Sequence, residues 1–198
     1  TGVIYSSIFI LSKKDPETFQ SGSYIFSTQG LIVYPAYVMS YVLPKHIQEA
    51  LDNDTPHEVG DILKASGIIS CLYTLPATVF LVLAPYLYKK LGQNPIVISI
   101  VGKYLRLFPL ALPATCCLAF LQQYSLKMNS PWSLPISDMT NAILNIAVSS
   151  FLCFGPPKLG VEGVVCGYIA SANITLLLYL IKLGFDGKAK IHNLFTLP

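Results

Sequence analysis

Charged residues are absent from five long stretches of this chain, and their absence indicates the solvent in which the chain folds. The stretches cover residues 18–44, 65–88, 107–126, 139–157 and 163–181. A helix needs about 20 apolar residues to cross the hydrocarbon core of a bilayer, which is roughly 30 Å thick. A sixth stretch, residues 1–11, is apolar but too short. We interpret it as the second half of a truncated first span.

The composition supports lipid as that solvent. The chain is 53% hydrophobic and 12% charged, whereas soluble domains carry about 25% charged residues. Inside a bilayer each backbone amide needs an internal partner, which favours helices. A barrel would need alternating segments of about 10 residues, and the runs here are longer and apolar throughout. The net charge of +3 is spread over loops, so a nucleic-acid partner is not expected.

These observations predict an all-α integral membrane protein, a polytopic bundle of about six transmembrane helices. We expect residues 1–183 to form one transmembrane lobe and residues 184–198 to be a polar tail or an inter-lobe linker. Asp54-Thr55-Pro56 is typical of a helix start, so a helix should run from there into the third span. Residues 96–106 contain Lys103 and Arg106, and we interpret them as an interfacial helix before the fourth span.

No signature of an enzyme, a metal site or an organic cofactor is found. The sequence lacks a Gly-rich phosphate loop, and its three histidines are not spaced as metal ligands. The five cysteines all lie in the charge-free stretches, where a disulfide framework is not expected. We predict that they are small packing residues.

Two acidic residues approach the membrane interior. Asp138 and Glu162 are each predicted in the first turn of a span, where a carboxylate can satisfy free N–H groups and the helix dipole. Ionisable residues in membrane helices are also candidates for ion pathways. Helix capping and cation coupling therefore both stay open for these two side chains.

Uncharged polar residues recur at helical spacing in the last two spans. Asp138, Asn141, Asn145 and Ser149 share one face of the fifth span, and Tyr168, Ser171, Thr175 and Tyr179 share one face of the sixth. Such a stripe faces either a partner helix, through interhelical hydrogen bonds, or a water-filled cavity.

Aromatic and amide side chains give further candidates. Tyr34 and Tyr37 could line a cavity and hold an organic cation by cation–π contact, or they could belong to an interfacial belt. Gln122 and Gln123, near the end of the fourth span, are expected at the interface. Prolines in the third and fourth spans, Pro76, Pro85, Pro109 and Pro113, can kink a helix.

Three groups of motifs, taken in order, resemble the N-terminal lobe of a multidrug and toxic compound extrusion (MATE) transporter. The first is His-Ile-Gln-Glu-Ala at 46–50, followed by a helix that restarts at 58–67. The second is Lys-Tyr-Leu-Arg at 103–106 with the two prolines that follow it. The third is Asn-Ala-Ile-Leu-Asn at 141–145, followed by Leu-Gly-Val-Glu-Gly at 159–163. The match extends over nearly the whole chain, which would be half of a twelve-helix transporter.

The chain departs from the family at several cation-binding positions. The family's acidic residue of helix one should fall near Tyr5 or Ser6, and its acidic residue of helix five is replaced by Asn145. A threonine of helix six is replaced by Tyr168. Asn141 matches the family's asparagine of helix five.

The resemblance implies a secondary transporter that exports amphipathic, cationic organic compounds by antiport against H⁺ or Na⁺. Asp138, Asn141, Asn145 and Glu162 are the coupling candidates. The candidates for the substrate cavity are Tyr34, Tyr37, Ser149, Tyr168, Ser171 and Thr175. The partners would be the bilayer of a plasma or inner membrane, a second lobe (a missing C-terminal half or another copy) and a small organic solute.

Two alternatives stay open. One is a flippase for a lipid-linked sugar from a related branch of the superfamily, although such cavities tend to be cationic and the spans hold no mid-membrane Lys or Arg. The other is a non-transporting membrane scaffold or a degenerate half-transporter, which the missing carboxylates would favour.

Overall fold

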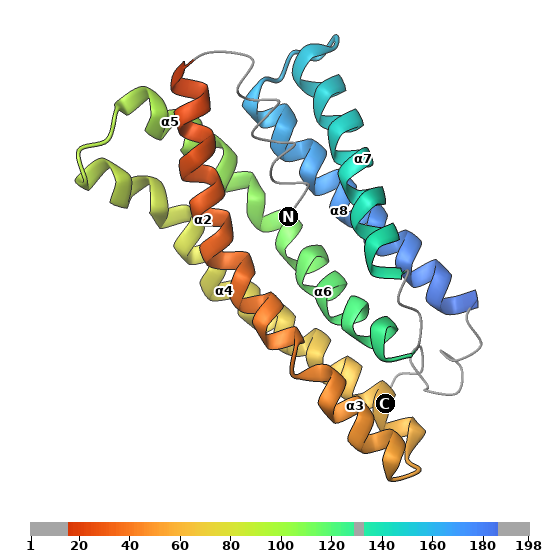
Figure 1. Cartoon of the computed structure of the whole chain (residues 1–198). Coiled ribbons are helices and arrows are strands. Elements are labelled where there is room, and N and C mark those ends of the chain that lie inside the picture. Colours follow the sequence, from red (N-terminus) through yellow and green to blue (C-terminus); the bar gives the residue numbers. More distant parts are fainter. Residues whose placement is uncertain (1–15, 129–132, 186–198) are drawn as a thin grey trace.

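The computed structural model describes residues 16–128 and 133–185, and every regular element in those ranges is a helix (Figure 1). The elements are α2 (Pro16–Ser40), α3 (Leu43–Asp52), α4 (Pro56–Lys90), α5 (Pro95–Leu107), η1 (Phe108–Ala111), α6 (Leu112–Lys127), α7 (Ser133–Phe154) and α8 (Val161–Phe185). The all-helical bundle predicted from the sequence is confirmed. The segments predicted as a first span, as the turn after α6 and, apart from its first two residues, as the tail lie outside the described residues.

Proline and glycine mark the ends of α4 and the start of α5. Gly92 has a φ of 75°, a left-handed conformation that only glycine adopts without strain, and it follows the last turn of α4. The Asn94 side chain then accepts a hydrogen bond of 2.9 Å from the Ile96 N–H, and Pro95 occupies the first turn of α5. The predicted start of α4 at Pro56 is also observed.

The fourth span is longer than expected. α5, η1 and α6 follow one another as one candidate span, Pro95–Lys127, so the helix predicted at 96–106 is observed as α5 and leads directly into the fourth span. α5 packs against α2, α4 and α8, and its Tyr104 and Leu105 are fully buried. The span tightens into a 3₁₀ turn at Phe108–Ala111. Pro109 and Pro113 explain this change, because each lacks the N–H that an α-helix would use there.

Polar side chains of α2 face the inside of the bundle. Gln29 donates a 2.8 Å hydrogen bond to the Tyr104 hydroxyl of α5, and the Thr28 hydroxyl lies 2.6 Å from that of Tyr88 in α4. The Tyr73 hydroxyl of α4 donates to the Ile32 carbonyl at 2.6 Å. Large apolar side chains on α2 point outward instead, and Leu31 is 62% exposed. Polar side chains inside the bundle and large apolar side chains outside are expected where the surrounding solvent is lipid.

Four helical segments of the described part are long and apolar enough to cross a membrane. They are His57–Lys90, Pro95–Lys127, Leu134–Phe154 and Glu162–Phe185. α2 corresponds to the remaining predicted span, and its serines, threonines and glutamines lower its hydropathy. The chain is therefore an integral, multi-pass membrane protein by the length and composition of its helices.

The last two helices, α7 and α8, form the closest pair and lie side by side (Figure 1). A Cβ atom added at Gly167 would lie 2.7 Å from the Ser149 backbone N and Cα, and one added at Gly163 would lie 2.8 Å from the Leu152 carbonyl carbon. Gly163 and Gly167 thus form the Gly-x-x-x-Gly pattern that lets membrane helices approach closely.

We expect Gly167→Ala to destabilise the protein by about 2 to 3 kcal/mol, because the new methyl group overlaps backbone that cannot move away alone. Thermal unfolding in detergent, followed by circular dichroism, measures the change. Gly30→Ala is the matched control, since no atom lies within 4 Å of the added Cβ. Equal midpoints for the two variants would contradict close packing at Gly167.

Candidate functional site

A seam of uncharged polar residues lies between α7 and α8. Asn145 and Ser149 are both 0% exposed, and the Ser149 hydroxyl donates to the Val164 carbonyl at 3.2 Å. On α8, Ser171 and Thr175 are also buried, and the Ser171 hydroxyl donates to the Tyr168 carbonyl at 2.9 Å. The seam joins the two polar stripes predicted from the sequence.

The antiparallel packing sets the order of residues along this seam. Ser149 lies against Gly167, and Leu152 lies against Gly163. One turn of helix further on, Asn145 comes to the level of Ser171. A second turn brings Asn141 to the level of Thr175. The candidate coupling residues Asn141 and Asn145 therefore meet the candidate cavity residues Ser171 and Thr175 along one helix–helix contact.

Two oxygen atoms in the seam have no hydrogen-bond partner among the described residues. They are Asn141 Oδ1 and Thr175 Oγ1, and both are buried. An unsatisfied buried polar group costs about 1 to 3 kcal/mol, so most such groups in proteins have a partner. Carbonyl and hydroxyl oxygens can accept a hydrogen bond from water or coordinate a hard cation. The Asn141 and Thr175 oxygens could therefore bind a water molecule or a small cation.

The prediction that Asp138 lies in the first turn of its helix is wrong, and this removes helix capping from its two open roles. α7 begins at Ser133, and its first turn holds no acidic residue. Asp138 Oδ1 instead accepts a 3.1 Å hydrogen bond from Gln122 of α6, whose amide also donates to Ser137 at 2.8 Å. Asp138 lies one turn before Asn141 on the same face of α7.

Gln122 and Gln123 are buried inside the bundle near the end of α6, with exposed fractions of 5% and 8%. Sequence reasoning missed the contact between Gln122 and Asp138. The available signal was two adjacent amides near the end of an apolar helix, because a buried amide needs a polar partner.

The tyrosine candidates differ in environment. Tyr168 is buried, and its ring centroid lies 5.4 Å from that of Phe108. Tyr37 is half-buried and packs against the same apolar core as Tyr168. Tyr34 is 71% exposed on the outer surface of α2. Tyr34 and Tyr37 therefore lie in different environments. Tyr37 contacts the apolar core, whereas Tyr34 does not.

Glu162 lies in the first turn of α8, as predicted. Its carboxylate pairs with the Lys103 ammonium of α5 at 3.6 Å, and both side chains are about half exposed. This ion pair links α5 to α8 at the surface. Glu162 is thus separated from the buried seam around Asn141.

A cavity of about 610 Å³ lies elsewhere, among the end of α2, α3, α4 and α6. None of the residues predicted as site residues lines it. Within residues 16–128 and 133–185, no group of three His, Cys, Asp or Glu side chains could hold a metal ion.

Comparison with known proteins identifies the fold. No family model matches the sequence, and no curated protein matches it. Among solved structures, the chain is similar to an inward-facing multidrug resistance MATE family transporter of the MOP superfamily, with a TM-score of 0.84 and 14% sequence identity. The match covers 92% of this chain and 42% of that transporter. The described helices thus have the fold of part of such a transporter.

We expect Thr175→Val to leave stability unchanged or to raise it by about 1 kcal/mol, because it removes an unpaired buried hydroxyl without changing shape. Ser149→Ala is the comparison, since it breaks an existing hydrogen bond and should cost about 1 kcal/mol. Chemical unfolding of the two purified variants measures both effects. A loss of stability for Thr175→Val that matched or exceeded the loss for Ser149→Ala would show that Thr175 Oγ1 has a partner.

Proposed function

We propose that this chain is one lobe of a secondary transporter that exports amphipathic, cationic organic compounds by antiport against H⁺ or Na⁺. The proposal places it in the plasma or inner membrane, paired with a second lobe. The two unpaired oxygens at Asn141 and Thr175 carry this proposal. They are buried between membrane helices, where an unsatisfied polar group costs about 1 to 3 kcal/mol that a bound water or cation would remove.

The shared fold supports the same function. The solved structure that it resembles is named a multidrug resistance transporter, and this chain spans 42% of its length. In two-lobed transporters the substrate site lies near the midplane between the lobes. A single lobe therefore presents half of such a site, and the other half comes from a C-terminal half or another copy.

Within the lobe, we assign cation coupling to Asp138 and Asn141. Asn141 contributes an unpaired oxygen, and Asp138 supplies a negative charge one turn away. Gln122 holds the Asp138 carboxylate through its amide N–H. We place Asn145 and Ser149 as packing residues of the seam, because both are fully buried between α7 and α8. Glu162 is assigned to the ion pair with Lys103.

The organic solute would contact the side of the lobe that carries Tyr37. Tyr168 belongs to the apolar core against which Tyr37 packs, and Ser171 lies one turn further along α8. An aromatic ring near a low-dielectric site attracts an organic cation by about 0.5 to 2 kcal/mol. Tyr34 faces outward and is assigned to contact with lipid or with the second lobe.

We expect Asn141→Leu to reduce transport at least tenfold while the protein remains folded, because the substitution removes the only polar group of that side chain and one coupling oxygen. The measurement is uptake of a fluorescent organic cation into proteoliposomes that contain the full two-lobed protein, under an imposed H⁺ or Na⁺ gradient. Asn173→Leu is the matched control, since Asn173 is exposed on α8 and bonds only its own helix, at Ile169.

Any one of three results would contradict the proposal. Transport that survives collapse of every ion gradient would exclude antiport. Unchanged transport by Asn141→Leu and by Asp138→Asn would favour the scaffold alternative for this lobe. Transport of a lipid-linked sugar, with no transport of organic cations, would favour the flippase.

A further inference from the structure

An open cavity with an apolar floor lies at one end of the bundle, away from the seam. Its volume of about 610 Å³ is within the range of small-molecule sites, which is about 300 to 1,000 Å³. Val42 at the α2–α3 junction, Ile62 and Ile69 of α4, and Phe120 of α6 supply apolar surface. We call this cavity the α3–α4 groove.

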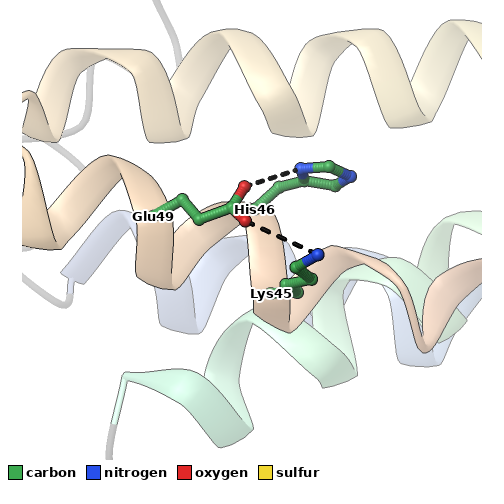
Figure 2. Close-up of polar contacts among 3 residues, drawn as sticks. All are labelled: Lys45, His46 and Glu49. Carbon is green, nitrogen blue, oxygen red and sulfur yellow. Dashed lines mark hydrogen bonds and ion pairs between the residues drawn. The ribbon is translucent and has the colours of Figure 1, made fainter.

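Acidic side chains line the rim of the α3–α4 groove. Glu49 of α3 and Glu58 of α4 both border it. Figure 2 shows that the Glu49 carboxylate pairs with Lys45, at 3.7 Å, and with His46, at 3.3 Å. No ion pair of the described part of the chain involves Glu58. One carboxylate at the rim is therefore available to a ligand.

The surrounding segment reinforces this negative charge. Residues 45–64 contain five acidic residues and two lysines, which gives a net charge of −3 with neutral histidines. A cleft lined by charge of one sign raises the local concentration of ions of the opposite sign. The groove should therefore attract cations and repel anions such as phosphate-bearing headgroups.

The groove lies at the level of the membrane surface. The span of α4, His57–Lys90, has 34 residues and is roughly 50 Å long at 1.5 Å per residue, so it exceeds the hydrocarbon core by about 20 Å. The charge-free part of α4 begins at Ala65. Glu58 is on the polar side of this boundary and Ile69 on the apolar side, so the groove connects the two environments.

We propose that the α3–α4 groove binds an amphipathic organic cation, with its apolar body on Ile62, Ile69 and Phe120 and its positive charge at the available Glu58 carboxylate, on the rim that Glu49 shares. A bare inorganic cation would gain nothing from the apolar floor. A neutral lipid chain would gain nothing from the carboxylates. The ligand that uses both surfaces carries one positive charge on an apolar frame.

This site shares no residue with the seam between α7 and α8. The inference therefore does not depend on transport, and it would hold for a lobe that moves no solute. A binding measurement tests it, whereas vesicle uptake tests the proposed function.

The experiment is calorimetric titration of the full chain, in a neutral detergent, with tetraphenylphosphonium. Tetraphenylborate has the same shape and the opposite charge, and we expect it to bind at least fivefold more weakly. The Glu49→Gln/Glu58→Gln double variant should lose about fivefold in affinity for the cation, the upper range for exposed charge pairs. Ala65→Trp should abolish binding, because Ala65 is an exposed residue of the groove wall and the indole would fill the space.

Two matched variants control for general effects of charge and bulk. Glu17→Gln makes the same change in the first turn of α2, and the contact of Tyr24 with Tyr88 places that helix start near the far end of α4. Ala147→Trp adds the same bulk at an exposed position of α7. Both should bind the cation as the unaltered chain does.

Three results would overturn the proposal. The first is cation binding that Ala65→Trp leaves unchanged, and the second is equal binding of both tetraphenyl ions. The third is binding that emerges only in a Lys188→Glu/Lys190→Glu variant of the full chain. That result would mean that the groove takes the chain's own basic C-terminal segment.

Discussion

The satisfaction of polar groups without water is the constraint on which this structure depends. A bilayer supplies no hydrogen-bond partner, so backbone amides pair within helices and polar side chains pair between them. α2 shows this most clearly, because Gln29 and Thr28 point inward to Tyr104 and Tyr88. Apolar side chains such as Leu31 then cover the outside. The usual order of a soluble protein, apolar inside and polar outside, is thereby partly reversed.

The same constraint makes buried polar atoms without a hydrogen-bond partner costly. Close approach of α7 and α8 at Gly163 and Gly167 makes the seam between them narrow. Asn141 Oδ1 and Thr175 Oγ1 are left without partners in a place where each carries an energetic cost. Apolar side chains at both positions would pack between the helices without this free-energy cost. The proposed cation coupling would account for the polar atoms at these positions.

The two proposed sites rest on different physical features. The seam is buried, holds uncharged oxygens and lies between two spans. The α3–α4 groove is open, carries carboxylates at its rim and lies where α4 leaves the apolar core. A cation that partitions into the membrane surface would meet the groove from the water side. The groove would then concentrate organic cations at one end of the bundle, whatever the lobe does with them afterwards.

The sequence by itself determined the solvent, the helical class and the spans from α2 to α8, because charge-free runs of about 20 residues fit only a bilayer. It also placed Asn141, Asn145 and Ser149 on one face of α7, because helical periodicity is local. It did not predict that Gln122 and Gln123 are buried inside the bundle, because their surroundings come from helices that local periodicity does not place. Only the tertiary structure brought Gln122 to Asp138, aligned Asn141 with Thr175 and opened the α3–α4 groove. Each of these depends on the register and crossing of helices, which local periodicity does not specify.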